Sequence, residues 1–159
     1  MSSLGKVVFV GKADSGKTSL IRAIKGLKFK FQYNPTISGD FASKTITFSD
    51  KSVLQVSLVE IGGGEQCISL IPMFARLSTI AFIVVPVNCT TITEDYIVPF
   101  LRALQLLKIP NIYVVGSKCD DKRDEYVVQA RSIADKYNLE FILSSAKTGE
   151  GVNNEIIGY

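Results

Sequence analysis

The feature that most constrains this chain is a glycine-rich loop between a strand and a helix. Residues 6–10 form a short apolar run typical of a strand buried on both faces. Residues 11–18 follow at once and read G-x-x-x-x-G-K-T, and a helix is expected over residues 16–26. In this pattern the glycines let backbone N–H groups turn toward phosphate oxygens at a helix N-terminus. The loop therefore predicts a phosphate-bearing ligand on an α/β scaffold.

Two residues of this loop have specific roles in the pattern. Lys17 brings positive charge to the β and γ phosphates, and Thr18 offers a hydroxyl to Mg²⁺. The competing interpretation, a coincidental glycine turn, is disfavoured by the strand before the loop and the helix after it. The residues expected to surround the phosphates are Ala13, Asp14, Ser15, Gly16, Lys17, Thr18 and Ser19.

Strand and helix signals alternate along the rest of the chain. Residues 41–49 and 53–60 predict an antiparallel hairpin, because apolar and polar side chains alternate in the second segment. The apolar run 80–87 predicts a central strand. The other predicted elements are a helical stretch containing Leu70, Ile71, Phe74 and Leu77, helices over 93–107 and 124–137, and strands over 111–116 and 141–143. Such alternation implies parallel crossovers and a layered α/β fold.

Composition excludes several classes of function. The 159 residues, 47% of them hydrophobic, suit one domain over residues 1–159, and a net charge of +3 without a dense basic block argues against a nucleic-acid partner. The chain has no histidine, which excludes imidazole-based catalysis and most zinc enzymes. Three widely spaced cysteines fit reduced thiols, and no apolar run is long enough to span a bilayer. A cytoplasmic location is expected.

Two further segments are expected at the carboxyl ends of later strands, where ligands bind in open α/β sheets. Residues 116–120 read Gly-Ser-Lys-Cys-Asp, and residues 144–147 read Ser-Ser-Ala-Lys. With the phosphate loop and Tyr33-Asn-Pro-Thr36, they occur in the order and spacing of the Ras/Rab superfamily of small GTPases, which the chain resembles over nearly its whole length. The resemblance implies a P-loop GTPase G domain. Its expected fold is a mostly parallel six-stranded sheet with one antiparallel edge strand and helices on both faces.

The resemblance also implies a guanine site. Asp120 would accept hydrogen bonds from the guanine ring N–H and exocyclic amine, a donor pair that adenine lacks. A base without these donors would be rejected, because the buried carboxylate oxygens would be left without partners. Lys118 would pack its aliphatic stem along the base, and Phe29 would contact it from the other side. The residues expected around the base are Phe29, Ser117, Lys118, Asp120, Ser145, Ala146 and Lys147.

A switch and a magnesium site are implied in the same way. Thr36, in a segment resembling switch I together with Tyr33, would bind Mg²⁺ and sense the γ-phosphate, so that local order depends on GTP. Glu60 would act on the metal indirectly through a water, and Gly63 would lie beside the phosphates. The expected metal residues are Thr18, Thr36 and Glu60.

The chain departs from the family pattern at the hydrolysis element D-x-x-G-Q. The matching residues are Glu60-Ile-Gly-Gly63-Gly64, of which only Gly63 agrees. Gly64 replaces the glutamine that orients the attacking water, which predicts slow GTP hydrolysis, and Gln66 is a possible substitute two residues later. No residue is therefore assigned as catalytic with certainty.

Two other departures affect the nucleotide. Asp14 places a carboxylate in the phosphate loop. Ser117 replaces an asparagine and is expected to lose the amide that ties the base loop to the phosphate loop, which predicts weaker nucleotide affinity.

The function these features favour is a guanine-nucleotide switch that depends on GTP or GDP and Mg²⁺, with weak hydrolysis. Effectors, exchange factors and GTPase-activating proteins are the expected partners, in intracellular signalling or vesicle trafficking. The alternative is a non-cycling pseudo-GTPase scaffold that holds one nucleotide, which Gly64 favours. An ATP-using P-loop kinase or ATPase is disfavoured by Asp120 and the 144–147 loop.

The C-terminal segment is short for this family. Residues 152–159 leave room for at most about two helical turns. The last helix is therefore expected to be truncated, and membrane association would need a lipidated tail beyond these residues.

Overall fold

The computed structural model describes residues 4–30 and 39–152. Its elements are β1 (Leu4–Val10), α1 (Lys17–Ile24), β2 (Gly39–Thr47), β3 (Val53–Ile61), η1 (Glu65–Leu70), α2 (Ile71–Phe74), β4 (Ile80–Pro86), α3 (Glu94–Leu106), β5 (Asn111–Ser117), η2 (Cys119–Asp121), α4 (Asp124–Lys136) and β6 (Glu140–Leu143), where η marks a 3₁₀ helix.

The strands form one sheet with the order β2-β3-β1-β4-β5-β6. The β2–β3 pair is antiparallel, while β1 pairs in parallel with β3 and β4, and β5 pairs in parallel with β4 and β6. The predicted sheet, mostly parallel with one antiparallel edge strand, is confirmed. Because the parallel strands end at one edge, the loops that follow them gather there.

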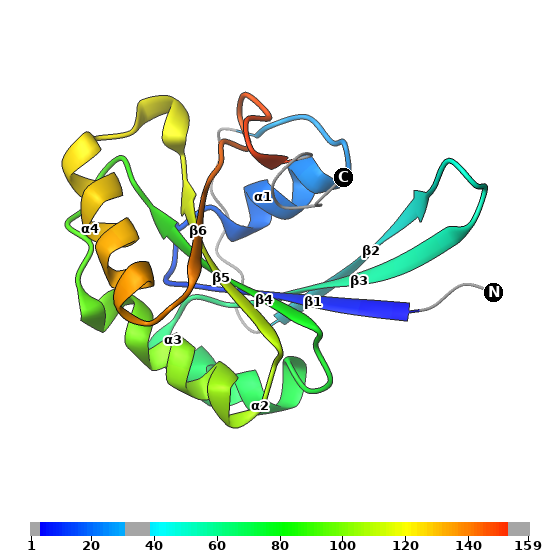
Figure 1. Ribbon diagram of the computed structural model, residues 1–159, viewed down its shortest axis with the longest axis horizontal. Coiled ribbons are helices and arrows are strands. Elements are labelled where there is room, and N and C mark those ends of the chain that lie inside the picture. The colour runs from blue at the N-terminus through cyan, green and yellow to red at the C-terminus, as the bar shows by residue number, and fades with distance from the viewer. Residues whose placement is uncertain (1–3, 31–38, 153–159) are drawn as a thin grey trace.

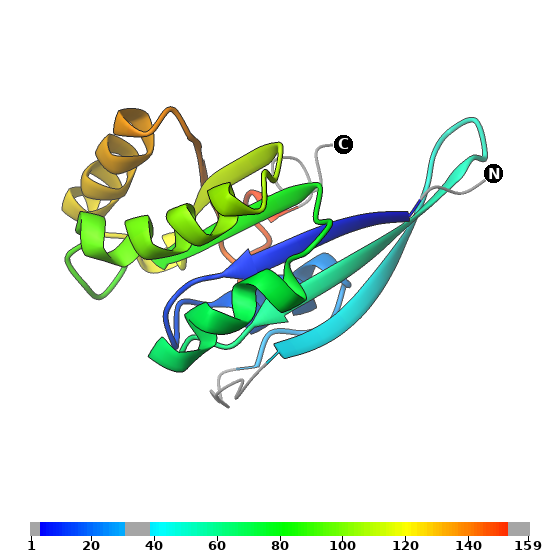
Figure 2. The same cartoon turned by 90° about the horizontal axis from the view of Figure 1, so that it is seen from below.

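Helices cover both faces of this sheet (Figures 1 and 2). Side chains alternate along β1: Val8 and Val10 join the core shared with α3 and α4, whereas Val7 and Phe9 pack in the core shared with α1. Residues 7–10 of β1 are all apolar because this part of the strand is buried on both faces of the sheet. The prediction of helices on both faces is confirmed.

The segment before β4 differs from the predicted helical stretch. It begins as the 3₁₀ helix η1 and continues as the short helix α2. Leu77, expected in this stretch, lies beyond it with φ 65° and a side chain that is 83% exposed. The expectation for Leu77 is wrong because a turn, with Ser78 N–H donating to the Ala75 carbonyl, ends the helix before that residue.

Within residues 4–30 and 39–152, the structure contains no helix with the length and apolar character needed to cross a bilayer.

Candidate functional site

A cavity of about 600 Å³ opens at the edge where the parallel strands end. It extends from the phosphate loop to the loops that follow β5 and β6. The lining residues are Asp14, Ser15, Gly16, Lys17, Thr18, Ser19, Leu20, Arg22, Phe29, Lys30, Glu60, Gly63, Asn88, Ser117, Lys118, Asp120, Asp121, Ser144, Ala146 and Lys147. The structure thus brings together along one cavity most of the residues that the sequence singles out.

The phosphate loop is shaped by a glycine at the start of α1. Gly16 is the N-cap of the helix and has φ 99°, a left-handed conformation that glycine adopts without steric cost. The helix then begins at Lys17, and the N–H of Leu20 donates to the Gly16 carbonyl at 2.9 Å. The helix N-terminus, with its partial positive charge, therefore faces the cavity.

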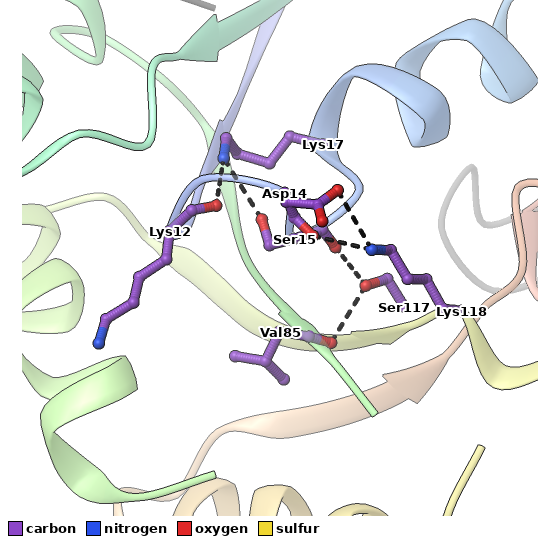
Figure 3. Close-up of polar contacts among 7 residues, drawn as sticks. All are labelled: Lys12, Asp14, Ser15, Lys17, Val85, Ser117 and Lys118. Atoms are coloured by element: carbon purple, nitrogen blue, oxygen red, sulfur yellow. Dashed lines mark hydrogen bonds and ion pairs between the residues drawn. The ribbon is translucent and has the colours of Figure 1, made fainter. Parts of the chain in front are cut away.

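The Lys17 side chain is buried within this loop. Its Nζ donates to the Gly11 carbonyl at 2.9 Å. It also donates to the Lys12 carbonyl at 2.8 Å and to Ser15 Oγ at 3.3 Å (Figure 3). Burial lowers the pKa of Lys17 to about 8, although the Glu60 carboxylate acts in the opposite direction. A buried ammonium whose hydrogen bonds go to neutral carbonyl and hydroxyl groups attracts an anion strongly.

Thr18 and Glu60 meet at the same end of the cavity. The Thr18 hydroxyl lies 2.8 Å from Oε1 and 2.6 Å from Oε2 of Glu60, whose side chain is buried. A hydroxyl that donates a hydrogen bond to a carboxylate still has lone pairs that can bind a cation. Hydroxyl and carboxylate oxygens are also the ligands that Mg²⁺ prefers. This pair fits a magnesium site completed by ligand phosphates and water.

Gly63 lies against the phosphate loop with no room for a side chain. A Cβ at this position would lie 2.2 Å from the backbone N and 2.5 Å from the Cα of Ala13. Ala13 itself is not among the lining residues, although its loop is. The close approach packs the loop after β3 directly onto the phosphate loop.

We expect Gly63→Ala to lower the free energy of unfolding by about 1 to 3 kcal/mol, because an added methyl group must push two backbone segments apart. Urea titration would measure this change. Gly5→Ala is the matched control, since a Cβ there would meet nothing within 4 Å. The control should leave stability unchanged or raise it by up to about 1 kcal/mol. Equal stability of the two variants would contradict the packing described for Gly63.

Ser117 joins the loop after β5 to the phosphate loop. Its hydroxyl lies within hydrogen-bond distance of the Ser15 carbonyl and 3.2 Å from the Val85 carbonyl, and the side chain is buried (Figure 3). The amide that is expected to tie the two loops is thus replaced by the serine hydroxyl, which still joins them, while the weaker nucleotide affinity stays a prediction. The physical reason is that β5 ends close enough to the phosphate loop for a short side chain to reach it.

Lys118 makes a second link between the same loops. Its Nζ donates to the Asp14 carbonyl at 2.8 Å and forms an ion pair with Asp14 Oδ1 at 3.4 Å (Figure 3). Both residues adopt left-handed backbone conformations, with φ 59° for Asp14 and φ 61° for Lys118. Non-glycine residues held in this region are common at functional sites. The Asp14 carboxylate is thus directed toward Lys118.

The far end of the cavity is formed by Asp120 and the loop after β6. The Ser145 hydroxyl donates to Asp120 Oδ1 at 2.7 Å, and the N–H of Thr148 donates to the same hydroxyl oxygen at 3.1 Å. Ser145 is fully buried behind the carboxylate, whereas Asp120 is exposed to the cavity. The expectation that the Asp120 carboxylate is buried against a guanine base stays a prediction. Asp120 lines the cavity, where a bound base would cover it.

Two of the lining residues carry a buried polar atom that has no hydrogen-bond partner among the described residues. These atoms are Oδ1 of Asn88 and Oγ of Ser144. Buried polar atoms usually have partners, so these two atoms are exceptions to the usual pattern. Sequence reasoning missed Asn88, and it named Ser144 as part of the loop after β6 without giving it a role. Asn88 could have been found, because it follows the central strand β4 at the carboxyl edge of the sheet.

Other lining residues were also missed, and some predicted residues cannot be placed. Leu20, Arg22, Lys30 and Asp121 line the cavity without having been singled out. Arg22 follows Thr18 by about one helical turn, which could have placed both on one face of α1. Tyr33 and Thr36 lie outside the described residues.

The sequence was compared with models of known protein families. Residues 6–158 match the Ras family, a stretch that contains every loop of this cavity.

Proposed function

Since the chain belongs to the Ras family of small GTPases, we propose that it is a molecular switch that binds GTP and GDP together with Mg²⁺. The observation that carries the proposal is the cavity itself. A phosphate loop with a buried lysine lies at one end, and a carboxylate positioned by Ser145 lies at the other. A guanine nucleotide has phosphates at one end, which suit the lysine, and N–H donors on its base at the other end, which suit the carboxylate.

At the base end, Asp120 accepts the two N–H donors of guanine. The hydrogen bond from Ser145 supports this role, because it fixes one carboxylate oxygen and so orients the other. Lys118 supports it as well, since its stem passes beside Gly16 on the way to Asp14. Phe29, Ala146 and Lys147 line the cavity and complete the base site.

At the phosphate end, Lys17 and the N-terminus of α1 bind the β and γ phosphates. Thr18 would hold Mg²⁺ through its hydroxyl oxygen, and Glu60, which accepts a hydrogen bond from that hydroxyl, would act on the metal through water. When bound, Mg²⁺ neutralises charge that develops on the phosphate oxygens during transfer. Thr36 is proposed as the further ligand that makes switch I sense the γ-phosphate.

GTP hydrolysis by this chain is proposed to be weak. Members with the complete machinery hydrolyse GTP unaided at only about 10⁻⁴ s⁻¹, and an arginine supplied by a partner adds about 10⁵-fold. Gly64 has no side chain with which to orient the attacking water, so hydrolysis at even this low rate needs another group to orient it. A partner protein would therefore set the lifetime of the GTP state.

Ras-family proteins generally act through regulators and effectors, and we propose that partners bind near α2 and β2. Phe41 on β2 is 62% exposed and its ring centroid lies 5.6 Å from that of Phe74 on α2, beside Met73, which is 64% exposed. Exposed apolar side chains that gather in this way suit protein contact. The proposed setting is the cytoplasm, in signalling or vesicle trafficking.

The second candidate is a scaffold that holds one nucleotide without cycling, which Gly64 favours. A switch changes structure between its GTP and GDP states, whereas a scaffold does not. This difference gives the test.

The test measures binding of GTP, GDP and ATP by calorimetry with Mg²⁺, then hydrogen exchange of the protein loaded with a non-hydrolysable GTP analogue or with GDP. We expect guanine nucleotides to bind about 10⁴-fold more tightly than ATP, because the site is built around guanine donors. Exchange should differ between the two states in residues 31–38 and 62–76. Equal exchange would support the scaffold, and equal affinity for ATP would reject the guanine site.

A further inference from the structure

The side-chain amide of Gln66 lies over the backbone of Gly64. A Cβ built on Gly64 would be 2.9 Å from both Nε2 and Oε1 of Gln66 and 3.1 Å from its Cδ. The carboxamide therefore occupies the space into which a side chain at residue 64 would extend. It can do so only because residue 64 is glycine.

This position is next to the phosphate end of the nucleotide cavity. Gly63, one residue earlier, lines the cavity and touches the backbone of the phosphate loop at Ala13. Lys17 and Thr18 line the same end. Gly64 and Gln66 do not line the cavity themselves, but the amide over Gly64 lies one residue along the chain from the cavity wall at Gly63.

The backbone around Gln66 is fixed while its side chain is exposed. The N–H of Cys67 donates to the Gly64 carbonyl at 2.9 Å, and the Ser69 hydroxyl donates to the Gln66 carbonyl at 2.7 Å. These bonds hold the first turn of η1. The exposed Gln66 side chain can then adjust at its end without moving the backbone that carries it.

A carboxamide at this place has the chemistry that the reaction needs. Its oxygen can accept a hydrogen bond from water and its nitrogen can donate one, which together orient a water molecule for attack. The same functional group is supplied by residue 64 in family members that carry glutamine there.

We infer that Gln66 orients the attacking water in GTP hydrolysis, in place of the side chain that Gly64 lacks. The inference rests on the proposed function. In the reaction the water oxygen bonds to the γ-phosphorus, and the bond from that phosphorus to the β–γ bridging oxygen breaks. The electron pair of that bond stays on GDP, and the protons of the water pass to inorganic phosphate and solvent. Gln66 emerges unchanged.

The experiment compares single-turnover hydrolysis by protein loaded with GTP and Mg²⁺, together with the dissociation constant for GTP. Gln66→Ala should lower the hydrolysis rate by about 10- to 100-fold, the size of effect expected when a reacting group is misplaced, while leaving GTP affinity unchanged. Gln105→Ala is the matched control, because it removes the same exposed side chain from α3, which lies away from the cavity. It should leave both quantities unchanged.

A second variant, Gly64→Gln, tests whether a carboxamide at residue 64 can take the place of the one on Gln66. In Gly64→Gln the new side chain displaces the amide of Gln66, so one carboxamide replaces another and the rate should stay close to that of the wild type. Gly64→Gln combined with Gln66→Ala should recover the rate that Gln66→Ala alone loses.

The outcomes separate this inference from the proposed function. If GTP binds but Gln66→Ala hydrolyses it as fast as the wild type, the role of Gln66 is overturned and the nucleotide site stands. Absence of measurable hydrolysis by the wild type over many hours has the same meaning. Failure of the wild type to bind GTP overturns both.

Discussion

Substituting Lys17 with Met should weaken GDP binding by about 10² to 10⁴-fold. Met retains the length of the stem and removes the charge. The Lys17 side chain is 4% exposed, so a phosphate bound to its ammonium would be shielded from water. Breaking a buried charge pair costs about 3 to 5 kcal/mol, and each 1.4 kcal/mol is about tenfold in affinity. Titration with a fluorescent GDP analogue would measure the loss.

Lys12→Met is the matched control for Lys17→Met. Lys12 belongs to the same loop and carries the same charge, but its side chain extends away from Lys17 (Figure 3). Its Nζ lies 4.6 Å from the centroid of the Tyr96 ring, and Lys12 does not line the cavity. An exposed cation of this kind contributes about 1 kcal/mol or less. Comparable losses in the two variants would mean that net charge, and not the position of Lys17, governs binding.

The unfolding transition of Lys17→Met should be measured alongside its affinity. In the wild type the Lys17 ammonium satisfies the carbonyls of Gly11 and Lys12, which lose this donor in the variant. A cooperative transition would show that the fold is retained and that the lost affinity belongs to the site.

Much of the fold follows from local pattern. The predicted apolar run 80–87 corresponds to β4, which is buried along most of its length. A parallel strand buried on both faces is apolar at nearly every position, so a continuous apolar run predicts it. The alternation in β3 likewise marked a strand whose partner β2 lies at the sheet edge. Leu77 was misjudged because a turn, which no periodicity reveals, ends the preceding helix.

The sequence predicted most residues of the site, but it did not predict the contacts between them. Strand ends gather at one edge of a parallel sheet, so the phosphate loop and Asp120 could be expected to share a cavity. The bond from Ser117 to the Ser15 carbonyl joins residues 102 positions apart, and its existence depends on how β5 aligns beside β4. The amide of Gln66 over Gly64 depends in the same way on how η1 begins. Neither the Ser117 contact nor the Gln66 contact can be predicted from the spacing of residues in the sequence.

Substituting Asp120 with Ala should reduce the preference for guanine over adenine nucleotides by about 10² to 10⁴-fold. The ring N–H and exocyclic amine of guanine would lose a charged acceptor, and a hydrogen bond to a charged group contributes about 1.5 to 3 kcal/mol. Two such bonds amount to about 3 to 6 kcal/mol of discrimination, at about tenfold for each 1.4 kcal/mol. ADP lacks this pair of neighbouring donors, so its affinity should hardly change. The ratio of dissociation constants for GDP and ADP measures the effect.

Asp121→Ala is the control that isolates the geometry of Asp120. Asp121 is the next residue in η2, is exposed, and lines the same cavity, so its removal changes the local charge by the same amount. Only Asp120 receives the hydrogen bond from the buried Ser145, which fixes its carboxylate toward the ligand. The GDP to ADP ratio of Asp121→Ala should therefore stay within about fivefold of the wild type, as for an exposed charge worth about 1 kcal/mol. A ratio that falls equally in both variants would assign guanine preference to the charge of the loop, and one that falls in neither would place base recognition elsewhere in the cavity.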